Sequence, residues 1–151
     1  MELIFKEITE KEIAGVLEMM AEFNAIDHYP FDVEKTNKNL LHLVLNDSLG
    51  KGWMLEADLH VCGYVILTYG YSFEHNGKDG LIDELYLKSE FRGQGLGKQT
   101  MEFIEKEAFR LGVNVLHLEV EPHNIGGTEL YRKNGYKDAG RILLSKKIVK
   151  S

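Results

Sequence analysis

The spacing of hydrophobic residues changes from strand-like to helical within the first half of the chain. After weak alternation at residues 2–8, apolar side chains recur every three or four positions up to Phe23, as on one face of a helix. Pro30 interrupts this pattern before a second apolar stretch that ends at Leu45. We therefore predict a strand at 2–8, a helix that begins after a capping box of Thr9 and Glu12, a loop at 24–31, and a second helix capped by Asp32 or Thr36.

The second half alternates between strand-like and helical segments. An Asn76-Gly77 pair gives a hairpin signal, Gly112 has the position of a helix C′ glycine, and Pro122 stops an alternating run. The predicted elements are strands at 52–57, 59–71, 78–87, 114–120, 136–138 and 142–149, and helices at 99–111 and 124–133. This order predicts an α/β fold with a mixed, mostly antiparallel central sheet flanked by helices.

Composition narrows the class of protein. The 151 residues predict a single domain, residues 1–151, with a proper core. Cys62 is the one cysteine of the sequence, which excludes a disulfide framework and fits a cytoplasmic location. The longest apolar run, residues 61–67, is too short to span a membrane, and no signal peptide or metal-ligand spacing is present. The net charge of −6 argues against a nucleic-acid partner and mildly favours cationic ligands, although solubility alone accounts for a charge of this size.

A glycine-rich stretch, Arg92 to Lys98, joins a predicted strand to the helix that follows. Free N–H groups and the positive end of the helix dipole make such a turn a site for anions, and glycine lets a phosphate approach the backbone. Lys98 and Thr100 stand where the dinucleotide fingerprint needs glycine, and Arg92 and Gln99 break the P-loop pattern. The remaining pattern, R-G-x-G-x-G, leaves an anion site and an ordinary strand-to-helix turn as alternatives.

Three blocks of the second half, taken in order, resemble the GNAT N-acetyltransferases, which bind acetyl-CoA. The glycine stretch is similar to their [QR]-x-x-G-x-[GA] pyrophosphate loop, residues 117–124 resemble the next strand, which ends in Asn, and residues 130–136 resemble their L-Y-x-[KR]-x-G-[FY] signature. Gly126-Gly127 departs from the family, which more often has Ala near 127, and glycine there weakens the helix by about 1 kcal/mol per residue. The resemblance implies an acyl-CoA N-acyltransferase (GNAT) fold with acetyl-CoA as cosubstrate and no metal.

The resemblance also implies residues that bind the cofactor. They are, in chain order, Leu85, Tyr86, Leu87, Arg92, Gly93, Gln94, Gly95, Leu96, Gly97, Lys98, Asn124 and Tyr131. The glycine loop is expected to bind the pyrophosphate through backbone N–H groups, and residues 85–87 are expected to pair with the pantetheine amides like a further strand. Asn124 is expected to hydrogen-bond the cofactor, to cap a helix, or both.

Amine acetylation requires that the acceptor ammonium lose a proton and that the departing thiolate be neutralised or stabilised. These two requirements identify the catalytic candidates. The Tyr131 hydroxyl is expected to stabilise the leaving thiolate, the alternative being a buried aromatic residue. Asp83 and Glu84 are the candidate bases, or else a plain surface pair. Glu84 resembles the acidic position often seen ahead of L-Y-V in the family, and Asp83 matches the position used by diamine acetyltransferases. Adjacent strand residues point to opposite faces, so only one carboxylate can face the site unless a bulge intervenes.

His28 and Tyr29 lie in the predicted loop at 24–31, where this family often lines its acceptor site; an exposed loop is the alternative. We predict an N-acetyltransferase that moves the acetyl group of acetyl-CoA to a primary amine of a small molecule, polyamine-like amines included, or of a peptide or protein. A homodimer without nucleic-acid or membrane partners is the expected assembly. The alternative function is a noncatalytic CoA-binding regulatory module of the same fold, and the failed loop patterns count against a nucleotide-binding protein.

Overall fold

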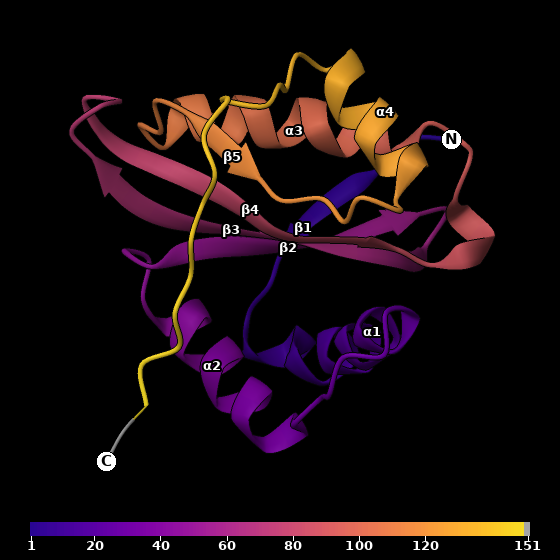
Figure 1. Ribbon diagram of the computed structural model, residues 1–151. Coiled ribbons are helices and arrows are strands. Elements are labelled where there is room, and N and C mark those ends of the chain that lie inside the picture. Colours follow the sequence, from indigo (N-terminus) through magenta and orange to yellow (C-terminus); the bar gives the residue numbers. More distant parts are fainter. Residues whose placement is uncertain (150–151) are drawn as a thin grey trace. The chain divides into compact units, whose positions relative to one another are not determined.

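The computed structural model describes residues 1–149 (Figure 1). Residues 1–119 form one compact unit, and a second, smaller unit begins at Val120. The single domain predicted for the whole chain stays a prediction.

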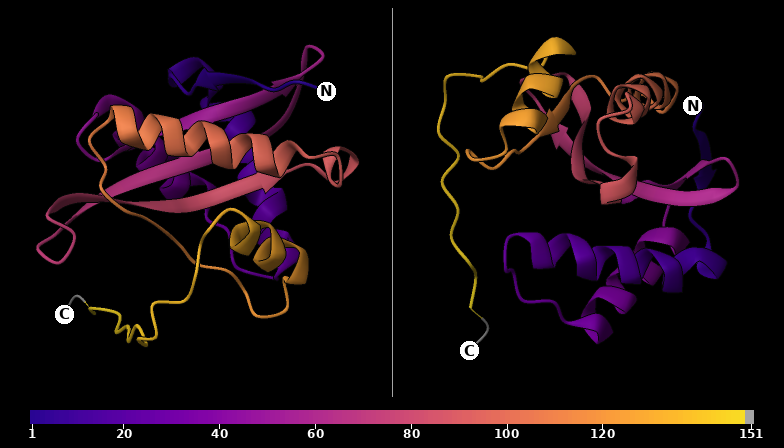
Figure 2. Two further views of the ribbon diagram at one scale, coloured as in Figure 1. Left: turned by 90° about the horizontal axis from the view of Figure 1, so that it is seen from above. Right: turned by 90° about the vertical axis from the view of Figure 1, so that its right-hand side faces the viewer.

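The first unit is a five-stranded sheet with helices on both faces (Figures 1 and 2). Its strands, in spatial order, are β1 (Ile4–Glu7), β2 (Gly50–Ala57), β3 (His60–Ser72), β4 (Gly77–Leu87) and β5 (Leu116–Leu118). Its helices are α1 (Ile13–Ile26), α2 (Val33–Leu45) and α3 (Leu96–Arg110), with the short 3-10 helices η1 (Glu10–Glu12) and η2 (Ser89–Phe91). β1 to β4 pair antiparallel and β5 pairs parallel with β4, which confirms the mixed, mostly antiparallel sheet.

The helices of this unit cover opposite faces of the sheet, with α1 and α2 on one face and α3 on the other (Figure 2). On one face, α1 and α2 enclose a cluster of buried residues: Val16, Met19, Met20, Leu40, Met54, Tyr64, Ile66 and Tyr86. On the other face, Phe103 of α3 stacks on Phe5 at 3.9 Å between ring centroids and meets the edge of Trp53 at 5.3 Å. Because strand side chains alternate between faces, the neighbours Trp53 and Met54 join different layers.

Local signals at the helix ends act as the sequence predicts. The buried Glu12 carboxylate accepts from Thr9 N at 2.8 Å and from Thr9 Oγ1, which completes the capping box before α1. The pKa of Glu12 is lowered to about 2, most strongly by the hydrogen bond from the Thr9 hydroxyl and further by the Lys6 ammonium. Burial of the carboxylate opposes this shift. Asp32 rather than Thr36 caps α2, since its side chain accepts from Lys35 N.

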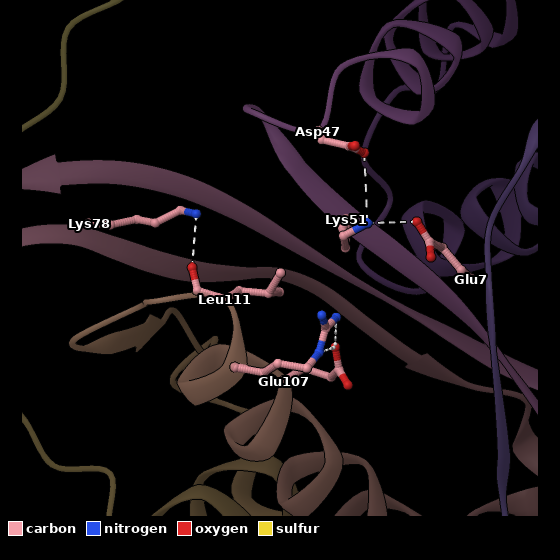
Figure 3. A network of polar contacts seen from close by, with 7 residues as sticks. Glu7, Asp47, Lys51, Lys78, Glu107 and Leu111 are labelled. Carbon is pink, nitrogen blue, oxygen red and sulfur yellow. Dashed lines mark hydrogen bonds and ion pairs between the residues drawn. The ribbon is translucent and has the colours of Figure 1, made fainter.

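Polar contacts tie the strands to the ends of the neighbouring helices (Figure 3). Lys51 Nζ lies 2.8 Å from Glu7 Oε1 on β1 and 3.7 Å from Asp47 Oδ1 after α2. Lys78 Nζ donates to the Leu111 carbonyl at 3.0 Å, where a cation complements the C-terminal end of α3. The Lys78 contact joins β4 to the C-terminal end of α3, and the glycine-rich stretch lies at the other end of this helix.

The second unit contains one helix, α4 (Ile125–Lys133), in its described part. The strands predicted at 136–138 and 142–149 are wrong, because the described residues form none there. Ile142, Leu143 and Leu144 are 87%, 78% and 88% exposed. Apolar, β-branched composition suits a pleated surface, but a strand also needs a neighbouring strand to share its hydrogen bonds.

Candidate functional site

The glycine-rich stretch forms the junction between β4 and α3. Gly93 and Gly95 have φ of 73° and 80°, in the left-handed region that favours glycine, and Gly95 is the N-cap of α3. The helix begins at Leu96, three residues before the predicted start. The prediction missed this first turn because its glycines show no apolar periodicity. Gln99 N is the first amide to bond back within the helix, to Gly95 O. The N–H groups just before it are therefore available to an anion at the positive end of α3.

Two basic residues accompany this turn. Arg92 Nε donates to the Leu87 carbonyl at 2.8 Å, and the Arg92 guanidinium lies 5.7 Å from the centre of the Tyr86 ring. Lys98 is exposed and lies 4.0 Å from Glu102, one turn further along α3. Leu96 is fully buried, so it anchors the turn in the core rather than offering its side chain to a ligand.

β4 has an edge that β5 leaves open beyond Ile82 in the part of the chain that the structure describes. Lys88 N donates to Cys62 O at 2.8 Å, and hydrogen-bonded pairs alternate with non-bonded pairs along antiparallel strands. Tyr86 therefore bonds to Tyr64 on β3, whereas the backbone groups of Leu85 and Leu87 face the open edge. The edge thus offers strand-like pairing at alternate residues, beside the glycine turn.

The predicted carboxylates lie at a β-bulge. Ile66 pairs with Glu84 and Leu67 pairs with Ile82, so Asp83 has no cross-strand partner. The strict alternation of faces, from which we expected only one carboxylate at the site, therefore does not hold at this point. Bulges re-aim side chains next to functional sites, and the structure supplies the one exception that the sequence argument allowed.

The two carboxylates differ in their surroundings. Glu84 Oε1 accepts from the Tyr64 hydroxyl at 2.5 Å and is half-buried, while Asp83 is exposed. Nearby protein atoms partly desolvate both carboxyls and so raise the pKa of each, that of the exposed Asp83 included. For Glu84, the Tyr64 hydroxyl opposes this rise and the Asp83 charge adds to it. A half-buried carboxylate with a raised pKa and a fixed orientation can accept a proton from an amine better than an ordinary one.

An aromatic cluster connects the carboxylate region to α1. The rings of Tyr86 and Phe23 stack at 5.5 Å, and Tyr64 lies 5.9 Å from Tyr86. The Tyr86 hydroxyl donates to Glu22 Oε2 at 2.9 Å. Sequence reasoning missed both Tyr64 and Glu22, because only the register of β3 with β4 and the placement of α1 bring these residues together.

His28 and Tyr29 follow the end of α1. The helix continues to Ile26, so the predicted loop at 24–31 is shorter than expected. His28 has a φ of 57°, and Tyr29, which is 53% exposed, donates its N–H to Asn24 O at 2.9 Å. The structure leaves both side chains on the surface near the helix end.

The second unit carries the other two predicted residues. Asn124 is the N-cap of α4, and its Oδ1 accepts from Gly127 N at 2.9 Å. A Cβ at Gly127 would come within 2.6 Å of the Asn124 side chain, so this glycine makes room for the cap. Tyr131 lies in α4, its ring contacts Tyr136 at 6.4 Å, and burial raises its pKa.

The described residues, 1–149, offer neither a metal site nor a membrane-spanning helix. Those residues hold no group of three His, Cys, Asp or Glu side chains that could bind a metal ion. None of the helices found among them is both long and apolar enough to cross a membrane.

Comparison with known proteins gives a consistent result. The model of the acetyltransferase (GNAT) family matches residues 16–136. A thialysine N-epsilon-acetyltransferase of Bos taurus is 31% identical over 78 residues, which are 52% of this chain and 45% of the bovine protein, so the match spans about half of that relative. An IAA acetyltransferase of Azospirillum brasilense is 27% identical over 115 residues, 76% of this chain and 74% of that one. The structure of a predicted acetyltransferase with acetyl-CoA from Clostridium acetobutylicum shares the fold, with a TM-score of 0.81 at 14% identity over 96% of each chain.

Proposed function

Because the chain belongs to the GNAT acetyltransferase family, we propose that it transfers the acetyl group of acetyl-CoA to a primary amine. The observation that carries this proposal is the junction of β4 and α3. There, a helix N-terminus preceded by glycines adjoins a strand edge on which the backbone groups of Leu85 have no partner strand among the described residues. A pyrophosphate attached to a chain of amides is the ligand that such a pair of features suits.

The residues proposed to bind the cofactor are taken from the glycine turn, from the edge of β4 and from the family resemblance. The N–H groups of residues 93–98 bind the pyrophosphate, with Arg92 and Lys98 adding positive charge. Leu85 and the N–H group of Leu87 pair with the pantetheine amides, since Arg92 Nε already occupies the Leu87 carbonyl. The Tyr86 backbone remains bonded to β3. The family resemblance is the reason for including Asn124 and Tyr131 among these residues. Asn124 is proposed to bind the cofactor and to cap α4 at the same time.

Glu84 is the proposed base. An acceptor ammonium must lose a proton before its nitrogen can attack the thioester carbonyl, and Glu84 takes that proton, directly or through a water molecule. Acetyl-CoA supplies the activated acyl group, whose carbon–sulfur bond breaks as the new carbon–nitrogen bond forms. Tyr131 donates a hydrogen bond to the departing thiolate. The second proton that the nitrogen loses as the amide forms is transferred to this sulfur, so CoA leaves as the thiol. Asp83 is the second candidate base.

The acceptor is proposed to be cationic and polyamine-like, or else an amino group of a peptide or protein. Glu84, Asp83 and Glu22 all carry negative charge in the region of β4 and α1, and the chain has a net charge of −6. His28 and Tyr29 are proposed to contact the acceptor from the end of α1. The relative named for thialysine N-epsilon acetylation supports an amine acceptor. A homodimer and a cytoplasmic location belong to the same proposal.

Thermal stability and thiol release test this function together. Acetyl-CoA should raise the melting temperature, because ligand that binds the native state alone stabilises it, whereas ATP and NAD should not. A panel of diamines, monoamines, peptides and amino sugars should then give amine-dependent release of CoA thiol from acetyl-CoA. Binding without thiol release from any amine would favour the noncatalytic CoA-binding module. Equal stabilisation by ATP would contradict the cofactor assignment itself.

A further inference from the structure

Tyr64 holds the carboxylate of Glu84 from inside the core. The Tyr64 side chain is fully buried on β3, and its hydroxyl donates to Glu84 Oε1 at 2.5 Å. Tyr64 pairs with Tyr86 and Ile66 pairs with Glu84, so all four side chains lie on the face of the sheet that α1 covers. Close packing around the phenol ring fixes the position of its hydroxyl.

We propose that Tyr64 is a positioning residue for the base of the reaction. Its hydroxyl occupies Glu84 Oε1 and sets the direction of the carboxylate, which leaves Oε2 to accept the proton of the acceptor ammonium. The inference rests on the proposed function, because Glu84 needs an aimed oxygen only if it takes a proton from an amine. If this hydrogen bond served only to hold β3 against β4, its removal would leave turnover unchanged.

The charged and titratable groups around Glu84 come from three elements. Tyr64 contributes from β3, and Asp83 contributes from the bulge of β4. The pair of Tyr86 with Glu22 of α1 lies next to them. Burial raises the pKa of Glu84, the Tyr64 hydroxyl lowers it, and Asp83 raises it further. Removal of the hydroxyl leaves both raising effects in place, so the pKa of Glu84 must rise.

Tyr64→Phe removes the hydroxyl and keeps the ring. Glu84 is titrated by NMR of carboxyl-labelled glutamate, with Glu84→Gln to assign its signal, and kcat is measured against pH with saturating acetyl-CoA and amine. The midpoint of the Glu84 titration and the midpoint of the kcat profile should both rise by about one pH unit. At a pH well below these midpoints, kcat should therefore fall about tenfold. Tyr69→Phe is the matched control, because it removes a tyrosine hydroxyl from the opposite face of β3 and should leave the Glu84 midpoint in place.

The outcomes separate this inference from the proposed function. An unchanged Glu84 midpoint in folded Tyr64→Phe overturns the inference, whatever the activity. A raised midpoint with an unchanged kcat profile overturns it as well, since the hydrogen bond would then be structural only. If the Glu84 midpoint rises in Tyr64→Phe but the wild-type protein acetylates no amine, the proposed function is overturned instead. Should Tyr64→Phe fail to fold, the Tyr64 ring signal of the wild type must follow the Glu84 titration, and a signal that does not follow it overturns the inference.

Discussion

Alanine at Gly95 tests the cofactor turn against a second glycine of matching conformation. Gly95 caps the start of α3 with a φ of 80°, and Gly112 follows its end with a φ of 78°. Apart from the glycine and its two neighbours in the chain, no described residue has an atom within 4 Å of a Cβ added at either position. A left-handed conformation costs an L residue about 1–2 kcal/mol. Both substitutions should therefore lower the free energy of unfolding by about the same amount, roughly 1 kcal/mol, or about 3 °C in Tm.

Acetyl-CoA affinity should distinguish the two variants. The Cβ of Gly95→Ala enters the group of N–H donors that we propose for the pyrophosphate, while Gly112→Ala lies at the opposite end of α3. One lost hydrogen bond to a charged group is worth about 1.5–3 kcal/mol, or roughly 10- to 100-fold in Kd. Isothermal titration with acetyl-CoA and urea unfolding, on the same preparations, give both quantities for each variant.

Equal Kd values for Gly95→Ala, Gly112→Ala and the wild type would refute the placement of the pyrophosphate at the start of α3. Weakened binding in both variants would also refute it, because the loss would then follow from general destabilisation of the helix.

Three further substitutions test other parts of the structure. Tyr131→Phe should lower kcat about 10²-fold with unchanged acetyl-CoA affinity, because a bond to the thiolate strengthens only as charge develops. Glu12→Gln should lower the free energy of unfolding by ~2 kcal/mol at pH 7. The pKa of Glu12 is lowered from 4.5 to about 2, so this stabilisation is present above pH 4.5 and lost as pH falls toward 2. Gly63→Ala puts a Cβ 2.0 Å from the Tyr86 carbonyl oxygen and should destabilise the protein by about 2 kcal/mol or more in urea.

Each of these predictions has an outcome that contradicts it. Normal turnover by folded Tyr131→Phe removes that residue from the mechanism. A loss of stability in Glu12→Gln that is the same at pH 2 and pH 7 rules out the titration argument. For Gly63→Ala the control is Gly15→Ala on α1, where an added Cβ meets no described atom within 4 Å apart from the adjoining residues and the nearby backbone of its own helix. A similar effect of the two alanines on stability would contradict the argument from close strand approach.

Signals that act over a few residues could be predicted from the sequence. The capping box of Thr9 and Glu12, the Asp32 cap and the C′ glycine at 112 depend only on neighbours along the chain. The glycine-rich stretch identified the strand-to-helix junction for the same reason. The start of the following helix was predicted too late, because Leu96 is the single apolar residue in a run of glycine and polar residues.

Features that depend on strand register could not be predicted. The bond from Tyr64 to Glu84 joins residues 20 positions apart, and the bulge at Asp83 shows only in the pairing of β3 with β4. Glu22 reaches Tyr86 across 64 positions. The strands expected at 136–138 and 142–149 failed for a related reason: composition describes the segment itself, whereas a strand is defined by its partner.

The bulge at Asp83 makes β4 tolerant of a change in length. Ile82 pairs with Leu67 and Glu84 pairs with Ile66, which are consecutive residues of β3. A chain that lacked Asp83 altogether could keep every pair of these two strands, and with them the face on which each side chain lies. Deletion of this residue, rather than its substitution, would therefore straighten the strand without shifting its register. Compared with Asp83→Ala, which removes the same carboxylate and keeps the extra residue, the deletion would separate the contribution of the local bend to aiming Glu84 from that of the Asp83 charge.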